Sequence, residues 1–175
     1  MNDQQERQSA PLDEVDMRIL RILQSDARIT NRDLAAAVHI SPTTALDRTR
    51  SLRRRGVITG ATLALDFTAI GRGVQALIAV RIRPPSREVI EAFRDWVAGL
   101  EETVGVFVTS GSEDFIIHVA VRDNQDLYAF VIDELTQRRE VADVRTSVVY
   151  EHLREQVVLP LEPRSSDPAR KSARR

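Results

Sequence analysis

Arginine side chains gather in one short stretch of the chain, where they could bind a polyanion. Residues 48–55 contain five arginines and no acidic residue, although the whole 175-residue chain has a net charge of −1. A guanidinium group can hydrogen-bond guanine or phosphate, and a threonine can contact phosphate or a thymine methyl group. Affinity for nucleic acid, if present, must therefore be local, because the molecule as a whole is not a polycation.

This basic stretch belongs to a helix whose two ends are marked in the sequence. Ser41 suits the N-cap, Pro42 the first helical position, and Gly56 follows the last basic residues. Small and apolar residues share the side that can pack inward: Ala45, Thr49 and Leu52. An arginine-rich outer side on such a helix fits the DNA major groove. The residues predicted to contact DNA are Ser41, Thr43, Thr44, Asp47, Arg48, Arg50, Arg53 and Arg54.

A basic stretch alone is more often a solvated helix surface, but two preceding elements favour the DNA interpretation here. Asp13 can cap a first helix with an apolar stripe, and Thr30 or Asn31 can begin a second one. The inward residues of the second helix are Leu34, Ala35 and Val38. His39 lies in the tight turn that follows, where we expect a left-handed backbone. Helix, helix, turn and basic helix together predict a helix-turn-helix.

Beyond Gly56 the apolar residues alternate, which predicts a small hairpin or wing over residues 57–67 that leads into a connecting strand. Gly71-Arg72-Gly73 is the predicted domain boundary, because two glycines let the chain change direction. We therefore expect a polar, disordered arm at 1–10, a winged helix-turn-helix at 11–60, and a linker at 61–73. A polar tail without apolar periodicity follows at 162–175.

Residues 74–161 show the order strand, helix, strand, strand, helix, strand. The predicted strands are 74–82, 104–109, 115–121 and 144–150, the helices begin after Ser86 and near Gln125, and 157–161 form a candidate fifth strand. The order βαββαβ is the split, ferredoxin-like arrangement of the α+β class, with both helices on one face of the sheet. Apolar residues are also expected on the other face: Leu77, Ala79, Ile116 and Ala120. A sheet that is apolar on both faces implies a partner sheet, so we infer a homodimer.

The composition excludes several classes of protein. Apolar content is 42% and charged content 29%, as in a globular protein, and there is no cysteine for a disulfide or a thiolate metal site. No apolar run approaches the ~20 residues of a membrane helix. Residues 1–10 are polar and do not resemble a signal peptide, so we expect a cytoplasmic protein.

Two other functions are alternatives to DNA binding. Ferredoxin-like dimers also serve as small-molecule enzymes or binding modules. However, His39, His118 and His152 are far apart in the sequence, with no metal-ligand spacing and no framed nucleophile, so we expect no metal and no cofactor. An RNA-binding sheet would need exposed aromatic residues, whereas these strands contain mainly Val, Ile and Ala.

A series of short motifs, taken in order, resembles the Lrp/AsnC (feast/famine) family of transcription regulators. The motifs are Leu12-Asp13-x-x-Asp16 with Ile19-Leu20, Leu34-Ala35, Ser41-Pro42-Thr43, Arg48, Gly56-Val57-Ile58, Leu65-Asp66, Ile70-Gly71, Ser110-Gly111-x-x-Asp114-Phe115, Thr146–Tyr150 and Leu159-Pro160-Leu161. The resemblance implies a winged helix-turn-helix joined to a ferredoxin-like (ACT-like) domain at 74–161. That domain binds a small effector, usually an amino acid, and assembles homodimers, with an octamer as the expected larger particle.

The resemblance places the effector near the Gly-x-x-Asp turn, at an interface between copies. The implied effector-binding residues are Gly111, Glu113, Asp114, Ser147, Val148 and Val149. A glycine turn can present backbone amides to a carboxylate, and Asp114 could meet an ammonium group. The alternative is that Gly111 and Asp114 only make a hairpin turn. Glu113 departs from the family pattern, and it could favour a basic amino acid or simply point into solvent.

Overall fold

The computed structural model describes residues 11–153 and 157–161, and these form two compact units. Of the described residues, 11–62 and 157–161 make up one unit, and Leu63–Leu153 make up the other. The division after Thr62 lies inside the predicted linker rather than at Gly71–Gly73. The expected arm at 1–10 and tail at 162–175 lie outside the described residues.

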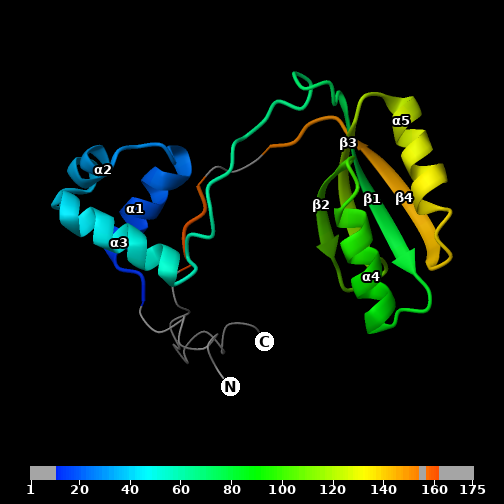
Figure 1. The fold of residues 1–175 in the computed structure, drawn as a ribbon, viewed down its shortest axis with the longest axis horizontal. Coiled ribbons are helices and arrows are strands. Elements are labelled where there is room, and N and C mark those ends of the chain that lie inside the picture. Colours follow the sequence, from blue (N-terminus) through cyan, green and yellow to red (C-terminus); the bar gives the residue numbers. More distant parts are fainter. Residues whose placement is uncertain (1–10, 154–156, 162–175) are drawn as a thin grey trace, which may run out of the picture. The chain divides into compact units, whose positions relative to one another are not determined.

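Three helices build the N-terminal unit: α1 (Glu14–Ser25), α2 (Asn31–Val38) and α3 (Pro42–Arg54) (Figure 1). Each begins at a side-chain N-cap, and the three capping residues are Asp13, Thr30 and Ser41. His39 ends α2 with φ 59° and ψ 46°, which confirms the expected left-handed turn residue. The buried apolar residues that hold the helices together are Ile19, Leu20, Leu34, Val38 and Leu52.

The segment after α3 differs from the prediction. Residues 57–66 contain no strand, so the predicted hairpin is wrong for the chain as described. The amides of Val57 and Ile58 both donate to the Leu52 carbonyl and continue the end of α3 instead. Leu63 and Leu65 are mostly exposed. Alternating apolar residues favour an extended backbone, but they supply no partner strand, and the residues that the structure describes offer none.

The C-terminal unit is a four-stranded antiparallel sheet in the order β2-β3-β1-β4 (Figure 1). Its strands are β1 (Val74–Ile82), β2 (Thr103–Val108), β3 (Phe115–Val121) and β4 (Val141–Val149). The helices are α4 (Arg87–Ala98) and α5 (Asn124–Ala129), and α5 continues as the π-helix η2 (Phe130–Leu135). This confirms the βαββαβ order. Strand β4 begins three residues before the predicted start, at Val141 rather than Val144.

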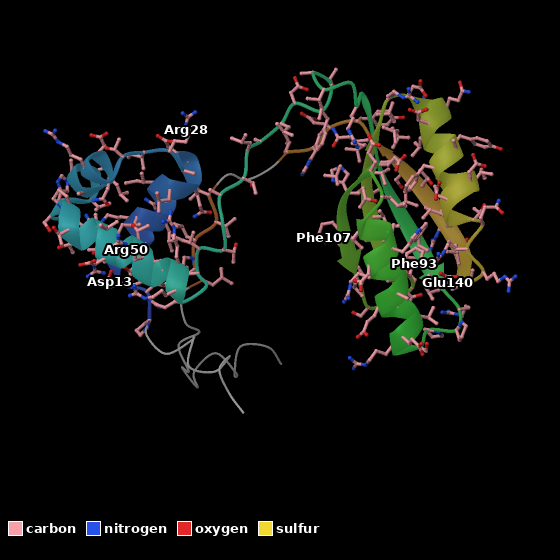
Figure 2. All side chains as sticks on the ribbon, viewed as in Figure 1. Asp13, Arg28, Arg50, Phe93, Phe107 and Glu140 are labelled. Carbon is pink, nitrogen blue, oxygen red and sulfur yellow. The ribbon has the colours of Figure 1, made fainter. Side chains whose placement is uncertain are left out.

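The core of this unit lies between one face of the sheet and its helices. Alternate residues of β1 are fully buried on that face: Ala76, Ile78, Val80 and Ile82. Phe93 and Val97 of α4 pack against them, and so do residues of α5 and η2. Figure 2 labels Phe93, whose ring lies 4.9 Å from that of Phe115 on β3. Both helices therefore cover one face, as the helical spacing of their apolar residues predicts.

The other face of the sheet, here called the open face, is only partly apolar and partly covered. Leu77 is 40% exposed and Phe107 on β2 is 59% exposed (Figure 2). Ala120, predicted on this face, pairs with Gln75 but is fully buried. The Arg72 guanidinium donates to the carbonyls of Ala120 and Glu101, at 3.0 and 2.8 Å. Alternation predicts which face a side chain is on, but not whether another segment covers it.

Residues 157–161 are not a strand of the sheet, so the candidate fifth strand is wrong. They belong to the N-terminal unit. The backbone N–H and carbonyl of Val158 are both hydrogen-bonded to the side chain of Gln24 on α1. No helix among the described residues is long and apolar enough to span a membrane.

Candidate functional site

The outward side of α3 carries a basic, solvent-exposed surface. Seven of the eight predicted contact residues are exposed, all but Arg48: Ser41, Thr43, Thr44, Asp47, Arg50, Arg53 and Arg54. Ala45, Thr49 and Leu52 are buried on the opposite side, as predicted. Arg50, labelled in Figure 2, and Arg54 are four residues apart and so lie next to each other along the helix. This surface can present two guanidinium groups to one stretch of a polyanion.

Ser41 and Thr44 serve the start of α3 itself. The Ser41 hydroxyl oxygen accepts the N–H of Thr44 at 3.1 Å, and the two hydroxyl oxygens lie 2.8 Å apart. Both residues are exposed at the N-terminal end of the helix. Their hydroxyl groups are therefore held in place before any ligand arrives.

Arg48 differs from the other predicted contact residues, because it is ion-paired within the unit. Its Nη1 atom lies 2.6 Å from Asp13 Oδ2 and 2.9 Å from Asp16 Oδ1. The Asp16 side chain is only 9% exposed, and Arg55 Nη1 lies 3.8 Å from its other oxygen. The hydrogen bond from the Asp16 N–H lowers the pKa of the Asp13 carboxyl group, and so does Arg48. Desolvation opposes them, but the pKa remains below its ordinary value. Asp13 and Asp16 in turn raise the pKa of Arg48.

These ion pairs join the start of α1 to the middle of α3, so Arg48 braces the recognition helix. We expect Arg48→Ala to lower the free energy of unfolding by about 1–3 kcal/mol, because the nearly buried Asp16 carboxylate loses a charged hydrogen-bond donor. Urea unfolding of the full chain measures this. Arg50→Ala, which removes an exposed arginine from the same helix, is the control and should change stability by less than about 0.5 kcal/mol. Equal stability of the two variants would contradict the bracing role.

The turn between β2 and β3 holds the predicted effector residues Gly111, Glu113 and Asp114. Asp114 ties this turn to β1 through both its backbone and its side chain. Its N–H donates to the Val80 carbonyl at 3.0 Å, and its Oδ2 atom accepts the N–H of Ile82 at 2.7 Å. Gly111 has φ 135°, where an L side chain is strained, although nothing lies within 4 Å of the position of a Cβ. Backbone conformation, and not crowding, therefore favours glycine there.

Glu113 does not point into solvent, which was one of the two alternatives left open by the sequence. Its side chain is 12% exposed, and both carboxylate oxygens are buried. The guanidinium of Arg145 contacts Oε1, and Arg81 Nη2 lies 3.7 Å from the same oxygen. Arg81 Nε also donates to the Ser112 carbonyl at 2.9 Å. The charge of Glu113 is thus matched within the chain by two arginines that sequence reasoning did not select.

The other predicted effector residues lie further along the sheet. Ser147 on β4 pairs with Leu77, whereas the turn is attached to β1 at Val80. A separation of three residues along a strand corresponds to roughly 10 Å. Val148 pairs with the buried Ala76 and so faces the helices, while Ser147 and Val149 face the open side. One copy of the chain does not bring the two groups of residues together.

A second polar cluster on the open face could not be seen in the sequence. His118 Nε2 lies 3.0 Å from the Gln75 side-chain oxygen, and its ring is 6.0 Å from that of His152. Burial lowers the pKa of His118, and the neighbouring His152 lowers it further. Among the described residues, no group of three or more His, Cys, Asp or Glu side chains could hold a metal ion.

Comparison with known proteins agrees with this geometry. Residues 12–59 match a winged helix-turn-helix DNA-binding model, and residues 75–159 match the Lrp/AsnC ligand binding domain. The HTH-type transcriptional regulator AldR of Mycobacterium tuberculosis is 41% identical over 145 residues, which are 83% of this chain and 81% of AldR. The leucine-responsive regulatory protein of Escherichia coli K12 is 32% identical over 155 residues, 89% of this chain and 94% of that protein.

A solved structure of a transcriptional regulator is also similar to this chain. The complex of a Neisseria meningitidis transcriptional regulator with L-Met has a TM-score of 0.79 and 29% identity, and the match covers 86% of this chain and 97% of that one. A helix-turn-helix unit joined to a ligand-binding α+β unit defines a DNA-binding transcriptional regulator and not an enzyme. The chain belongs to the Lrp/AsnC family.

Proposed function

We propose that the exposed side of α3 reads operator DNA in the major groove. The observation that carries this proposal is the division of the arginines of α3: Arg50 and Arg54 are exposed, whereas Arg48 is held by Asp13 and Asp16. The proposed contacts are Thr43, Asp47, Arg50, Arg53 and Arg54, with Ser41 and Thr44 at the helix start. Arg48 is a positioning residue in this proposal. The protein acts where its DNA lies, in the cytoplasm.

The regulator acts as a homodimer through its open sheet face, and dimers assemble further, with an octamer as the expected particle. The exposed apolar side chains of Leu77 and Phe107 support a partner on this face. The separation of the Gly111 turn from Ser147 supports an effector site shared between copies. In one copy the two groups lie about 10 Å apart along the strands. A small ligand that contacts residues of both groups would therefore bind between two copies.

The effector is an amino acid. Support comes from the Neisseria regulator, which was crystallised with L-Met. The decisive experiment is a thermal-shift screen of the full-length protein with each standard amino acid, because a ligand that binds the native state raises the unfolding temperature. Operator titrations with and without the stabilising amino acid then measure the coupling, which is typically ~1–3 kcal/mol, or ~5–150-fold in affinity. No stabilisation by any amino acid would contradict this effector class.

Two substitutions of Asp114 separate a ligand contact from a structural role. We expect Asp114→Asn to keep the hydrogen bond from the Ile82 N–H but to lose the thermal shift caused by the stabilising amino acid, because the amide cannot pair with an ammonium group. Asp114→Ala should in addition lower the unfolding temperature without ligand, since it leaves the Ile82 N–H without this acceptor. If Asp114→Asn responds to the amino acid as the wild type does, Asp114 only shapes the turn.

A further inference from the structure

The chain connects its two compact units twice. It leaves the N-terminal unit after Thr62, and after Leu153 it returns to that unit. Residues 157–161 thus follow the ligand-binding domain in sequence but belong to the unit that carries α3. The linker between the domains is therefore accompanied by a second connection at the other end of the ligand-binding domain.

The side chain of Gln24 holds the returning segment. Gln24 lies in the last turn of α1, and its Nε2 atom donates to the Val158 carbonyl at 3.0 Å. Its Oε1 atom accepts the Val158 N–H at 2.9 Å. One side-chain amide thus satisfies both backbone groups of one residue, as a neighbouring strand would in a sheet. This two-point contact determines both the position and the direction of the segment.

The two side chains that flank Val158 are partly buried. Val157 and Leu159 are half-buried, whereas Val158 between them is 70% exposed. Alternate side chains of an extended segment point to opposite sides, so this pattern indicates that Val157 and Leu159 share the less exposed side of the segment. Gln24 Nε2 also donates to the Leu20 carbonyl within α1 at 3.2 Å, which holds the amide in place.

We propose that residues 157–161 are a tether that restricts the movement of the DNA-binding unit relative to the ligand-binding unit, and that Gln24 is the positioning residue that holds it. In a dimer, a restricted unit presents its α3 to the second half-site at a higher effective concentration than a freely moving one does. Releasing the tether leaves the contacts of each α3 unchanged but lengthens the flexible connection. This inference rests on the proposed function in that it requires an operator with two half-sites.

The test uses the full-length Gln24→Ala variant and two DNA duplexes. One duplex carries a two-half-site operator selected from a random library, and the other carries the same sequence with one half-site scrambled. We expect affinity for the intact operator to fall on the order of tenfold, with no change on the scrambled duplex. Hydrogen exchange followed by mass spectrometry should show faster exchange in the peptide that contains Val158. Ser25→Ala is the matched control, because the Ser25 hydroxyl bonds only within α1 among the contacts described, to Arg21.

A second variant approaches the contact from its other side. Val158→Pro removes the N–H that Gln24 accepts, so it should reproduce the selective loss on the intact operator. The double variant should then be no weaker than either single variant, because both remove one shared interaction. Additive losses would contradict the assignment of Gln24 to this contact.

Several other results would overturn the tether proposal. Equal losses on both duplexes would overturn the proposal, since Gln24 would then act on the fold of the DNA-binding unit. Unchanged affinities despite faster exchange at Val158 would overturn it as well, and so would unchanged exchange. Wild-type protein that binds neither duplex would overturn both this inference and the proposed function, a result visible without any variant. Failure of the tether alone appears only as a difference between variants.

Discussion

Full-length protein with both Arg50 and Arg54 replaced by alanine should lose specific operator binding. Each arginine that contacts a base contributes ~1–3 kcal/mol, so the pair should cost at least about 30-fold in affinity. Both side chains are exposed on α3 and neither braces the unit, so the protein should remain folded. Fluorescence anisotropy with a labelled operator at several salt concentrations measures the loss. Each phosphate contact removed should also reduce the salt slope by about 1.

The control for this prediction removes equal charge elsewhere in the same unit. Arg28, labelled in Figure 2, is exposed in the loop between α1 and α2, and Arg32 is exposed on α2. The Arg28→Ala/Arg32→Ala double variant should weaken binding much less, because these residues lie outside the recognition helix. If both double variants weaken binding equally, the affinity comes from the general positive charge of the unit. The proposed placement of α3 in the groove would then be wrong.

The Leu77→Asp variant should dissociate the particle. Leu77 is 40% exposed on the open face, so in one copy an aspartate there can remain in solvent. In a dimer that covers this face, the same carboxylate would be buried without a partner, which is strongly unfavourable. Analytical ultracentrifugation should therefore show a monomer, and circular dichroism should show an unchanged fold. The dissociated protein should also lose its preference for operators with two half-sites.

Tyr128→Asp is the matched control for assembly. Tyr128 is 68% exposed and belongs to α5, which packs on the opposite face of the sheet. The Tyr128→Asp substitution adds the same charge as Leu77→Asp, but it does so away from the open face. The dimer should therefore persist. A Leu77→Asp particle with the wild-type mass would show that the open face is not the dimer interface.

Local signals in the sequence determined much of the fold. The N-caps Asp13 and Ser41 act within one helical turn, and the left-handed His39 follows from the tight turn it occupies. Apolar periodicity likewise predicted the βαββαβ order and the buried side of β1. These features are readable because the interacting groups lie a few residues apart, so spacing alone specifies them.

The exposed arginines of α3 were predicted for the same reason, but the two partners of Arg48 were not. Asp13 and Asp16 lie 35 and 32 residues before Arg48 in the sequence, and only the packing of α1 on α3 brings them together. Glu113 shows the same limit: it lies in a turn, and its partners Arg81 and Arg145 come from β1 and β4. The sequence around a charged side chain does not indicate a distant partner. Tertiary structure therefore decided whether such a side chain contacts a ligand or forms an ion pair within the chain.

Partner strands were the other feature that only the tertiary structure decided. Alternating apolar residues predicted a hairpin or wing at 57–67, and 157–161 was a candidate fifth strand, yet neither segment joins the sheet. Alternation specifies an extended backbone, but a strand also needs hydrogen-bonding groups on a neighbour. For Val158 those groups come from Gln24, 134 residues earlier in the chain. The sequence by itself therefore determined the elements and their exposed basic side, and three-dimensional contact decided which charges and backbone groups meet.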